Sequence, residues 1–165
     1  FNLMAYPYGG FFLNTVEHIA PLLLPANMCV TSGVNLAMST GIPANKVVLG
    51  IPAYCYAYAN CTQLGAPNKG SAPIGDGGIL DLNLLYKQNL TFKTFYDAKA
   101  GGAYSVCNEK SILVTHESDD TMKQKCQFIE SKQLGGAMLW HIASDWQDNT
   151  SLAKVAADRW LRKAN

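Results

Sequence analysis

Short apolar runs alternate with amphipathic segments along this chain. Three runs, at 1–6, 46–52 and 134–140, are apolar at both odd and even positions. Such runs are typical of strands that are buried on both faces of a parallel sheet. Amphipathic segments at 31–40 and 119–132 precede the second and third runs and predict helices that cover the sheet. This order predicts an α/β fold, either part of an α/β barrel or a doubly wound sheet.

The predicted helices have ordinary start and stop signals. Gly41 and Pro43 end the first, Ser118 begins the second, and a third runs over 152–160. One face of the second helix carries its apolar side chains: Met122, Cys126 and Ile129. We expect its charged side chains to be more exposed: Lys123, Lys125 and Glu130.

The middle of the chain has a different pattern. Short apolar runs between 91 and 115 are split by turn residues, which indicates small antiparallel strands, and a short helix is expected to start near Asp81. We therefore interpret 56–117 as a small α+β insertion between two framework parts, 1–55 and 118–165.

Three parallel strands leave two unpaired edges and an uncovered face. Nothing else in the sequence supplies strands to pair with them. We expect an incomplete fold, from a chain that is processed, truncated or only partly determined.

Composition narrows the class of protein. The 165 residues are 48% hydrophobic and 15% charged, which is typical of a globular domain. A net charge of +1 without a basic stripe gives no electrostatic case for a nucleic-acid partner. No apolar run reaches the length of a membrane span.

Five cysteines occur without CxxC spacing, so we expect no metal site and no cofactor. Cys55 and Cys61 bracket a loop short enough for a disulfide, and we hypothesise that they pair. Three N-x-S/T triplets are candidate glycosylation sites: Asn60, Asn89 and Asn149. Together these features favour an oxidising, secretory compartment.

Aromatic residues mark a candidate ligand surface. Met138 and Trp140 leave the same face of a strand, near its carboxyl end, where α/β folds place ligands. Tyr54, Tyr56 and Tyr58 recur at period two, and such a row of rings suits carbohydrate. The alternatives are that Trp140 only fills space in the hydrophobic core and that the three tyrosines only pack against other parts of the protein.

Four segments carry a resemblance to a known family. They are Lys46-Val-Val-Leu-Gly-Ile-Pro-Ala-Tyr54, Gly65-Ala-Pro67, Asp76-Gly-Gly78 and Leu134-Gly-Gly-Ala-Met-Leu-Trp140. In this order they resemble the carboxyl-terminal half of glycoside hydrolase family 18, the chitinase family. The resemblance implies a TIM-type (β/α)8 barrel, with strand 6 at Phe1–Pro7, strand 7 at Lys46–Pro52 and strand 8 at Ala137–Trp140. The run Tyr54–Cys61 is most similar to the di-N-acetylchitobiase branch.

The resemblance also implies substrate-assisted hydrolysis, in which a glutamic acid protonates the leaving group. The family's D-x-x-D-x-D-x-E motif is absent here. Its nearest match begins at Asp145 but has Thr150 and Leu152 where Asp and Glu are required. We interpret the remaining glutamates as solvated: Glu17, Glu109, Glu117 and Glu130. We therefore expect no catalytic residue and no activity in this chain alone.

The resemblance assigns the far wall of a sugar site to this chain. Tyr6 matches the tyrosine that hydrogen-bonds the acetamido carbonyl, and Trp140 matches the floor beneath the reacting sugar. Met138 matches the inward-facing neighbour of that tryptophan, and Tyr54 matches a groove-lining tyrosine. Two positions depart from the chitinases, since Pro7 replaces an aspartate and Tyr56 replaces an arginine, although the chitobiase branch shares that tyrosine. His141 is expected to point away from the site.

Two functions remain open. One is a hydrolase of β-1,4-linked N-acetylglucosamine, with its catalytic acid in a missing amino-terminal half. The other is an inactive lectin or structural extracellular glycoprotein, which Pro7 favours. Both imply an N-acetylglucosamine oligosaccharide as partner and a secreted, extracellular or lysosomal location.

Overall fold

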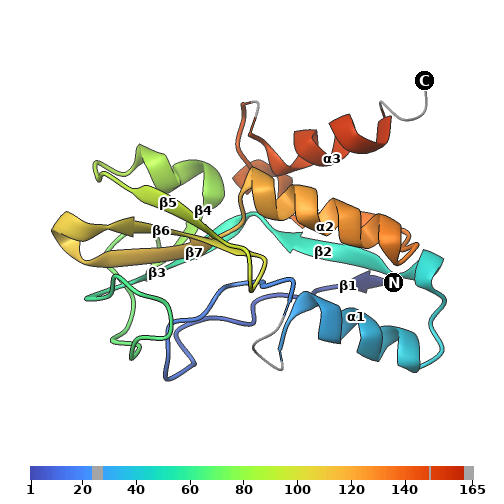
Figure 1. The fold of residues 1–165 in the computed structure, drawn as a ribbon. Coiled ribbons are helices and arrows are strands. Elements are labelled where there is room, and N and C mark those ends of the chain that lie inside the picture. The colour runs from blue at the N-terminus through green and yellow to red at the C-terminus, as the bar shows by residue number, and fades with distance from the viewer. Residues whose placement is uncertain (24–27, 149, 162–165) are drawn as a thin grey trace.

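A computed structural model describes residues 1–23, 28–148 and 150–161 and contains two sheets (Figure 1). Three parallel strands form the first sheet in the order β1-β2-β8: β1 (Asn2–Leu3), β2 (Val48–Pro52) and β8 (Gly136–Trp140). Five antiparallel strands form the second in the order β4-β3-β7-β6-β5: β3 (Tyr54–Tyr58), β4 (Ile79–Asp81), β5 (Lys93–Asp97), β6 (Gly102–Cys107) and β7 (Ile112–His116). The predicted mixed α/β class is confirmed.

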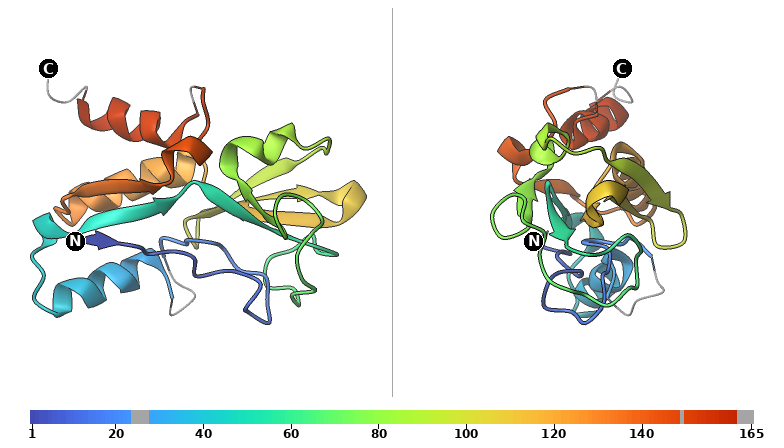
Figure 2. Two further views of the ribbon diagram at one scale, coloured as in Figure 1. Left: turned by 180° about the vertical axis from the view of Figure 1, so that it is seen from behind. Right: turned by 90° about the vertical axis from the view of Figure 1, so that its left-hand side faces the viewer.

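The three predicted helices are present at the expected places: α1 (Val30–Ser39), α2 (Asp119–Ser131) and α3 (Leu152–Leu161). They lie on one side of the parallel sheet. Seen from behind, in the left view of Figure 2, β2 and β8 face the viewer without an α-helix in front of them. None of the described helices combines the length and the apolar character that a membrane crossing needs.

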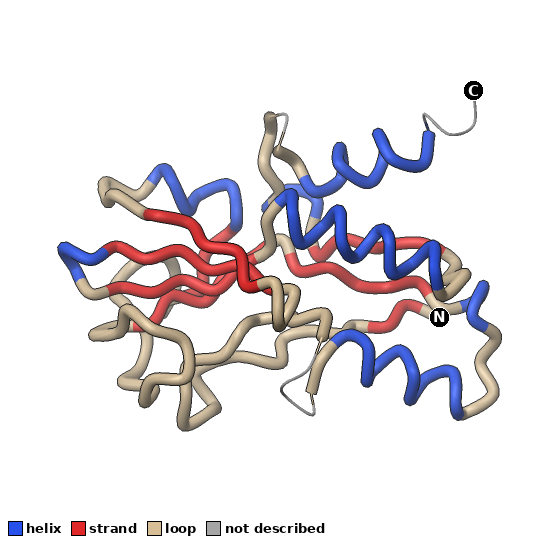
Figure 3. Tube along the Cα trace, viewed as in Figure 1, coloured by secondary structure: helices blue, strands red, loops and turns tan. Residues whose placement is uncertain are grey.

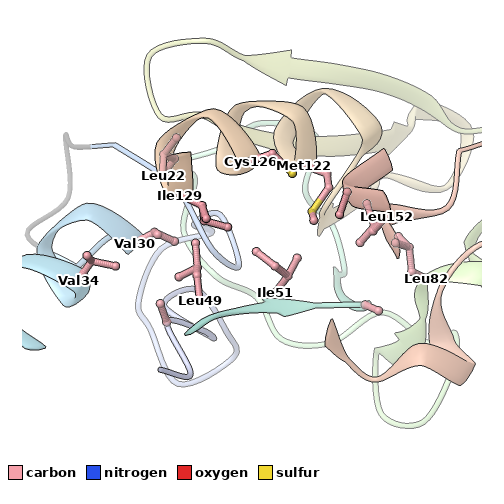
Figure 4. Packing of buried hydrophobic residues seen from close by; sticks show 13 residues of the cluster. Leu22, Val30, Val34, Leu49, Ile51, Leu82, Met122, Cys126, Ile129 and Leu152 are labelled. Atoms are coloured by element: carbon pink, nitrogen blue, oxygen red, sulfur yellow. The ribbon is translucent and has the colours of Figure 1, made fainter. Parts of the chain in front are cut away.

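The helix side of the parallel sheet forms the larger core. Leu49 and Ile51 of β2 are fully buried and point toward α2 (Figure 4). Met122, Cys126 and Ile129 meet them from α2, as the sequence pattern predicted. Burying an aliphatic side chain of this size contributes about 1.5–3 kcal/mol, so this layer holds the helices on the sheet.

The antiparallel sheet occupies the other half of the molecule (Figure 3). It begins at Tyr54, two residues before the predicted insertion, and the division of the chain into domains stays a prediction. The helix expected near Asp81 is a short 3-10 helix, η2 (Leu82–Lys87). Asp81 does not cap it, because its carboxylate accepts a hydrogen bond from Ser144 Oγ at 2.6 Å instead.

The first strand is shorter than predicted. Only Asn2 and Leu3 pair with β2, and the Ala5 N–H bonds back to the Leu3 carbonyl, so the chain leaves the sheet there. Phe1 and Met4 are 62% and 66% exposed, so the expectation of cover on both faces is wrong for this strand.

A buried ion pair corrects another expectation. The sequence pattern predicts an exposed Lys125 and a solvated Glu117, yet they are 0% and 2% exposed and form a salt bridge. Lys125 Nζ also donates to the Ala20 carbonyl at 2.7 Å, and Thr121 Oγ1 donates to the second oxygen of Glu117 at 2.5 Å. The pair therefore joins the 8–23 segment, the end of β7 and α2. Burial lowers the pKa of Lys125, and the Glu117 charge opposes that shift.

His116 is a second buried ionisable group. Its Nε2 lies 2.7 Å from Ser105 Oγ, and its Nδ1 lies 2.7 Å from the Glu117 carbonyl oxygen. Burial lowers the pKa of His116 to about 4, against a smaller opposing effect of the hydrogen bond to Glu117.

We expect Lys125→Met to destabilise the full-length protein by about 3–5 kcal/mol, because Glu117 would stay buried without a cation. The exposed Lys123→Met is the matched control, expected to change stability by less than about 0.5 kcal/mol. Urea unfolding measures both. Adding Glu117→Gln to Lys125→Met should recover part of the loss, and equal stability of the two lysine variants would contradict the assignment.

His116 should make stability depend on pH. Between about pH 4 and 6.5 the unfolded chain binds a proton at this position that the folded chain does not, so stability falls as pH falls through this window. The loss amounts to about 3 kcal/mol. His116→Gln should reduce the difference between the urea midpoints at pH 7 and pH 4.5, compared with the same difference in the parent protein. An unchanged pH dependence would show that His116 titrates normally.

Candidate functional site

Alternation along β2 and β8 separates a core face from an open face. Leu49 and Ile51 point to the helices, so Gly50 and Pro52 belong to the opposite face. The register pairs Gly50 with Met138 and Pro52 with Trp140. Met138 and Trp140 therefore lie on the open face of the parallel sheet, as predicted.

Tyr6 and Met138 meet above Gly50. A methyl group added to Gly50 would lie 2.7 Å from Tyr6 Cε1 and 3.3 Å from Met138 Cε. The missing side chain of Gly50 thus makes room for both, a role that no sequence signal had identified. The Tyr6 hydroxyl is buried and has no hydrogen-bond partner among the described residues, and burial raises the pKa of Tyr6. A protonated hydroxyl is therefore free to donate to a ligand.

Trp140 does not fill a core in this structure, because it is 55% exposed. Its backbone is nevertheless fixed, since its carbonyl accepts the Ala53 N–H at 2.7 Å. An indole that is exposed but held by its backbone is suited to contact one face of an amphipathic ring.

A row of aromatic rings leads from Tyr6 along β3. Tyr6 meets Tyr54 edge to face at 6.2 Å between centroids, and Tyr54 meets Tyr56 in the same way at 5.9 Å. Phe11 then bridges Tyr56 and Tyr58 at 5.0 and 5.2 Å. Tyr58 is fully buried, so the packing alternative holds for Tyr58, whereas Tyr54 and Tyr56 are half-buried. The row places the predicted groove-lining tyrosines beside Tyr6.

Hydrogen bonds at Ala53 and Ser144, which the sequence did not predict, connect the end of β8 to the antiparallel sheet. Ala53 is the single residue between β2 and β3, and its carbonyl accepts the Leu82 N–H at 3.0 Å. Ser144, which is 1% exposed, donates to Asp81 and lies 3.1 Å from His141 Nε2. His141 is exposed, and its contact with Ser144 gives it a structural role next to Trp140.

The glutamates lie away from this surface. Glu117 pairs with Lys125, Glu130 accepts hydrogen bonds from Arg159, Glu17 accepts one from Thr15, and Glu109 is exposed in a 3-10 turn. Asp145, the start of the nearest acid-motif match, is buried and accepts the N–H groups of Leu152 and Ala153 at the start of α3. Its carboxylate therefore stabilises a helix terminus.

The predicted Cys55–Cys61 disulfide is absent from the structure. Cys55 packs with Ala57 and Leu80 in one cluster, and Cys61 packs with Tyr58 in another. Both remain thiols, because alternation along β3 puts these clusters on opposite faces of the sheet. In the described part of the chain no three His, Cys, Asp or Glu side chains gather as metal ligands.

The candidate glycosylation residues Asn60 and Asn89 are exposed. Asn149 lies outside the described residues. Exposure permits modification of the first two, and the modification itself stays a prediction.

A cavity of about 450 Å³ lies away from the open face, lined among others by Tyr8, His18 and Asp97. Burial alone would raise the pKa of Asp97, but hydrogen bonds from His18 and the N–H groups of Ala100 and Lys99 hold it below its usual range. His18 Nε2 lies 3.2 Å from the Asp97 carboxylate, a contact that joins the segment after β1 to the end of β5.

The chain thus combines an α/β framework with an aromatic surface at the carboxyl ends of its parallel strands. Residues 1–145 match the family described as Glycosyl hydrolases family 18, and the chain belongs to that family. It is 34% identical over 168 residues to Endochitinase 1 of Metarhizium robertsii, covering 96% of this chain and 38% of that protein. It is 30% identical over 172 residues to a Class V chitinase of Arabidopsis thaliana, covering 96% of this chain and 43% of that protein.

Solved structures agree with the fold. A class V chitinase from Nicotiana tobaccum superposes with a TM-score of 0.86 and 29% identity, covering 96% of this chain and 48% of that one. A mutant of that chitinase, solved in complex with NAG4, has the same TM-score. The chain thus spans less than half the length of these relatives.

Gly50→Ala should displace the Tyr6 ring and strain β1, and cost about 1–3 kcal/mol of stability, because its methyl group would lie 2.7 Å from Tyr6 Cε1 and 2.8 Å from the Leu3 carbonyl oxygen. Urea unfolding gives stability, and near-ultraviolet circular dichroism follows the tyrosines. An unchanged tyrosine signal in Gly50→Ala would contradict the contact.

Proposed function

We propose that this chain supplies the substrate-binding wall of a chitinase-like glycoside hydrolase acting on β-1,4-linked N-acetylglucosamine. The observation that carries the proposal is the exposed Trp140 beside Met138 and Tyr6 on the open sheet face. Family membership and the NAG4-bound chitinase structure support the choice of sugar.

We further propose that β1, β2 and β8 are strands 6, 7 and 8 of a TIM-type (β/α)8 barrel. Their parallel order, helices on one face and two unpaired edges support this arrangement. The amino-terminal half of the barrel, in the same precursor or as a separate chain, would pair with these edges. Membership of the chitobiase branch, from the likeness of Tyr54–Cys61, belongs to the same proposal.

In this scheme the substrate's acetamido oxygen attacks the anomeric carbon, while an acid in the amino-terminal half protonates the leaving oxygen. The Tyr6 hydroxyl donates a hydrogen bond to the acetamido group, and Trp140 packs under the sugar ring. Tyr54 and Tyr56 line the groove beyond. This chain binds and orients the sugar, and it has no activity alone.

The alternative is an inactive chitinase-like lectin or a structural extracellular glycoprotein. Pro7 favours it, because a proline removes the hydrogen bond that the aspartate of the chitinases gives the sugar. In either case we propose a secreted or lysosomal protein that carries N-glycans at the exposed Asn60 and Asn89. Measured hydrolysis of chitooligosaccharides by the full-length protein separates the two functions.

Trp140→Ala in the full-length protein should weaken chitooligosaccharide binding about tenfold or more, because a shielded aromatic platform contributes about 2 kcal/mol. Trp140→Phe should recover part of the loss. Trp160→Phe, at a tryptophan of α3 that donates to Glu130, is the matched control and should bind normally. Calorimetric titration gives affinity and thermal melting checks folding. A folded Trp140→Ala variant with parental affinity would refute the proposal.

A further inference from the structure

A second aromatic surface lies on the other face of the antiparallel sheet. Tyr86 of η2 stacks on Trp146 with 5.2 Å between ring centroids and 18° between planes. The two rings line a cavity of about 330 Å³ with Asn83, Lys87, Gln147 and Asp148. This volume is at the lower end of the range for small-molecule sites.

This cavity is separate from the open face with Trp140. Tyr86 contacts Ser105, and Trp146 packs on the cluster that contains Cys55 and Ala57. Tyr56, from the row next to Tyr6, packs on the opposite face of the same sheet. A ligand in the cavity therefore does not occupy the groove of the proposed catalytic site.

The Tyr86 ring is held by its hydroxyl and by the stack on Trp146, although 48% of the residue is exposed. Its hydroxyl hydrogen-bonds Thr94 and lies 3.5 Å from Ser105 Oγ. Ser105 is fully buried and is itself held by His116 at 2.7 Å. Because the ring is already ordered, a ligand that stacks on it loses little side-chain entropy on binding.

The chemistry around the rings selects a neutral, polar ligand. Lys87 and Asp148 carry opposite charges, so the cavity favours neither an anion nor a cation. Asn83 and Gln147 add amide side chains to the lining. Aromatic rings bordered by amide and charged side chains match the alternating C–H and hydroxyl surface of a pyranose.

We propose that the Tyr86–Trp146 cavity is an outer carbohydrate site that binds one pyranose unit. That this unit is N-acetylglucosamine rests on the proposed function, whereas the outer site itself does not. A polymer held there and at Trp140 would contact the protein at two independent places.

The test is a titration of the full-length protein with chitotriose, made in a host that attaches no N-glycans. Heteronuclear NMR should show the indole N–H signal of Trp146, assigned from Trp146→Phe, shifting in Trp140→Ala as well as in the parent. Tyr86→Ala should weaken this binding roughly three- to tenfold. Tyr96→Ala, at another exposed tyrosine outside the cavity, is the matched control and should leave it unchanged.

Tyr86→Phe keeps the ring but removes its hydroxyl contacts, so it should fold and bind with intermediate affinity. Parental binding at Trp146 in Tyr86→Ala, or no Trp146 shift in any variant, would overturn the outer site. Loss of binding in Tyr86→Ala with no effect of Trp140→Ala would support the outer site and overturn the proposed function. Cellotriose in place of chitotriose tests whether the acetamido group matters.

Discussion

The buried pair of Glu117 and Lys125 is the constraint on which the arrangement of the two sheets depends. Its atoms come from the end of the antiparallel sheet and from α2, and its third partner, the Ala20 carbonyl, comes from the segment after β1. Taking two charges out of water costs several kcal/mol per ion, which is offset only when each charge finds its partners. The pair therefore specifies one way of bringing these three segments together.

Much of the framework could be predicted from the sequence, because packing on one face leaves a periodic pattern. Met122, Cys126 and Ile129 revealed α2, and the runs before Pro52 and His141 revealed β2 and β8. The Trp140 surface followed from alternation along a strand. Each of these features arises from residues close together in the sequence, so the pattern of apolar positions is enough to predict it.

The predictions that failed depend on how the chain packs in three dimensions. Charged side chains are usually exposed, so nothing in the local pattern around Lys125 signalled a carbonyl 105 residues away. Spacing made a Cys55–Cys61 bond plausible, but Cys55 packs in the cluster on one face of β3 and Cys61, beyond the strand, packs with Tyr58 in the cluster on the other. The function of Gly50 became visible only when the positions of Tyr6 and Met138 were known.

The single residue between the two sheets has a mechanical consequence. Ala53 is fully buried, and both of its backbone groups are hydrogen-bonded, one to Trp140 and one to Leu82. Both hydrogen bonds would have to break before the two sheets could turn about Ala53, so they oppose any change in the spacing between the tyrosine row and the indole. A sugar chain bound as proposed would have to match that spacing with its own repeat length.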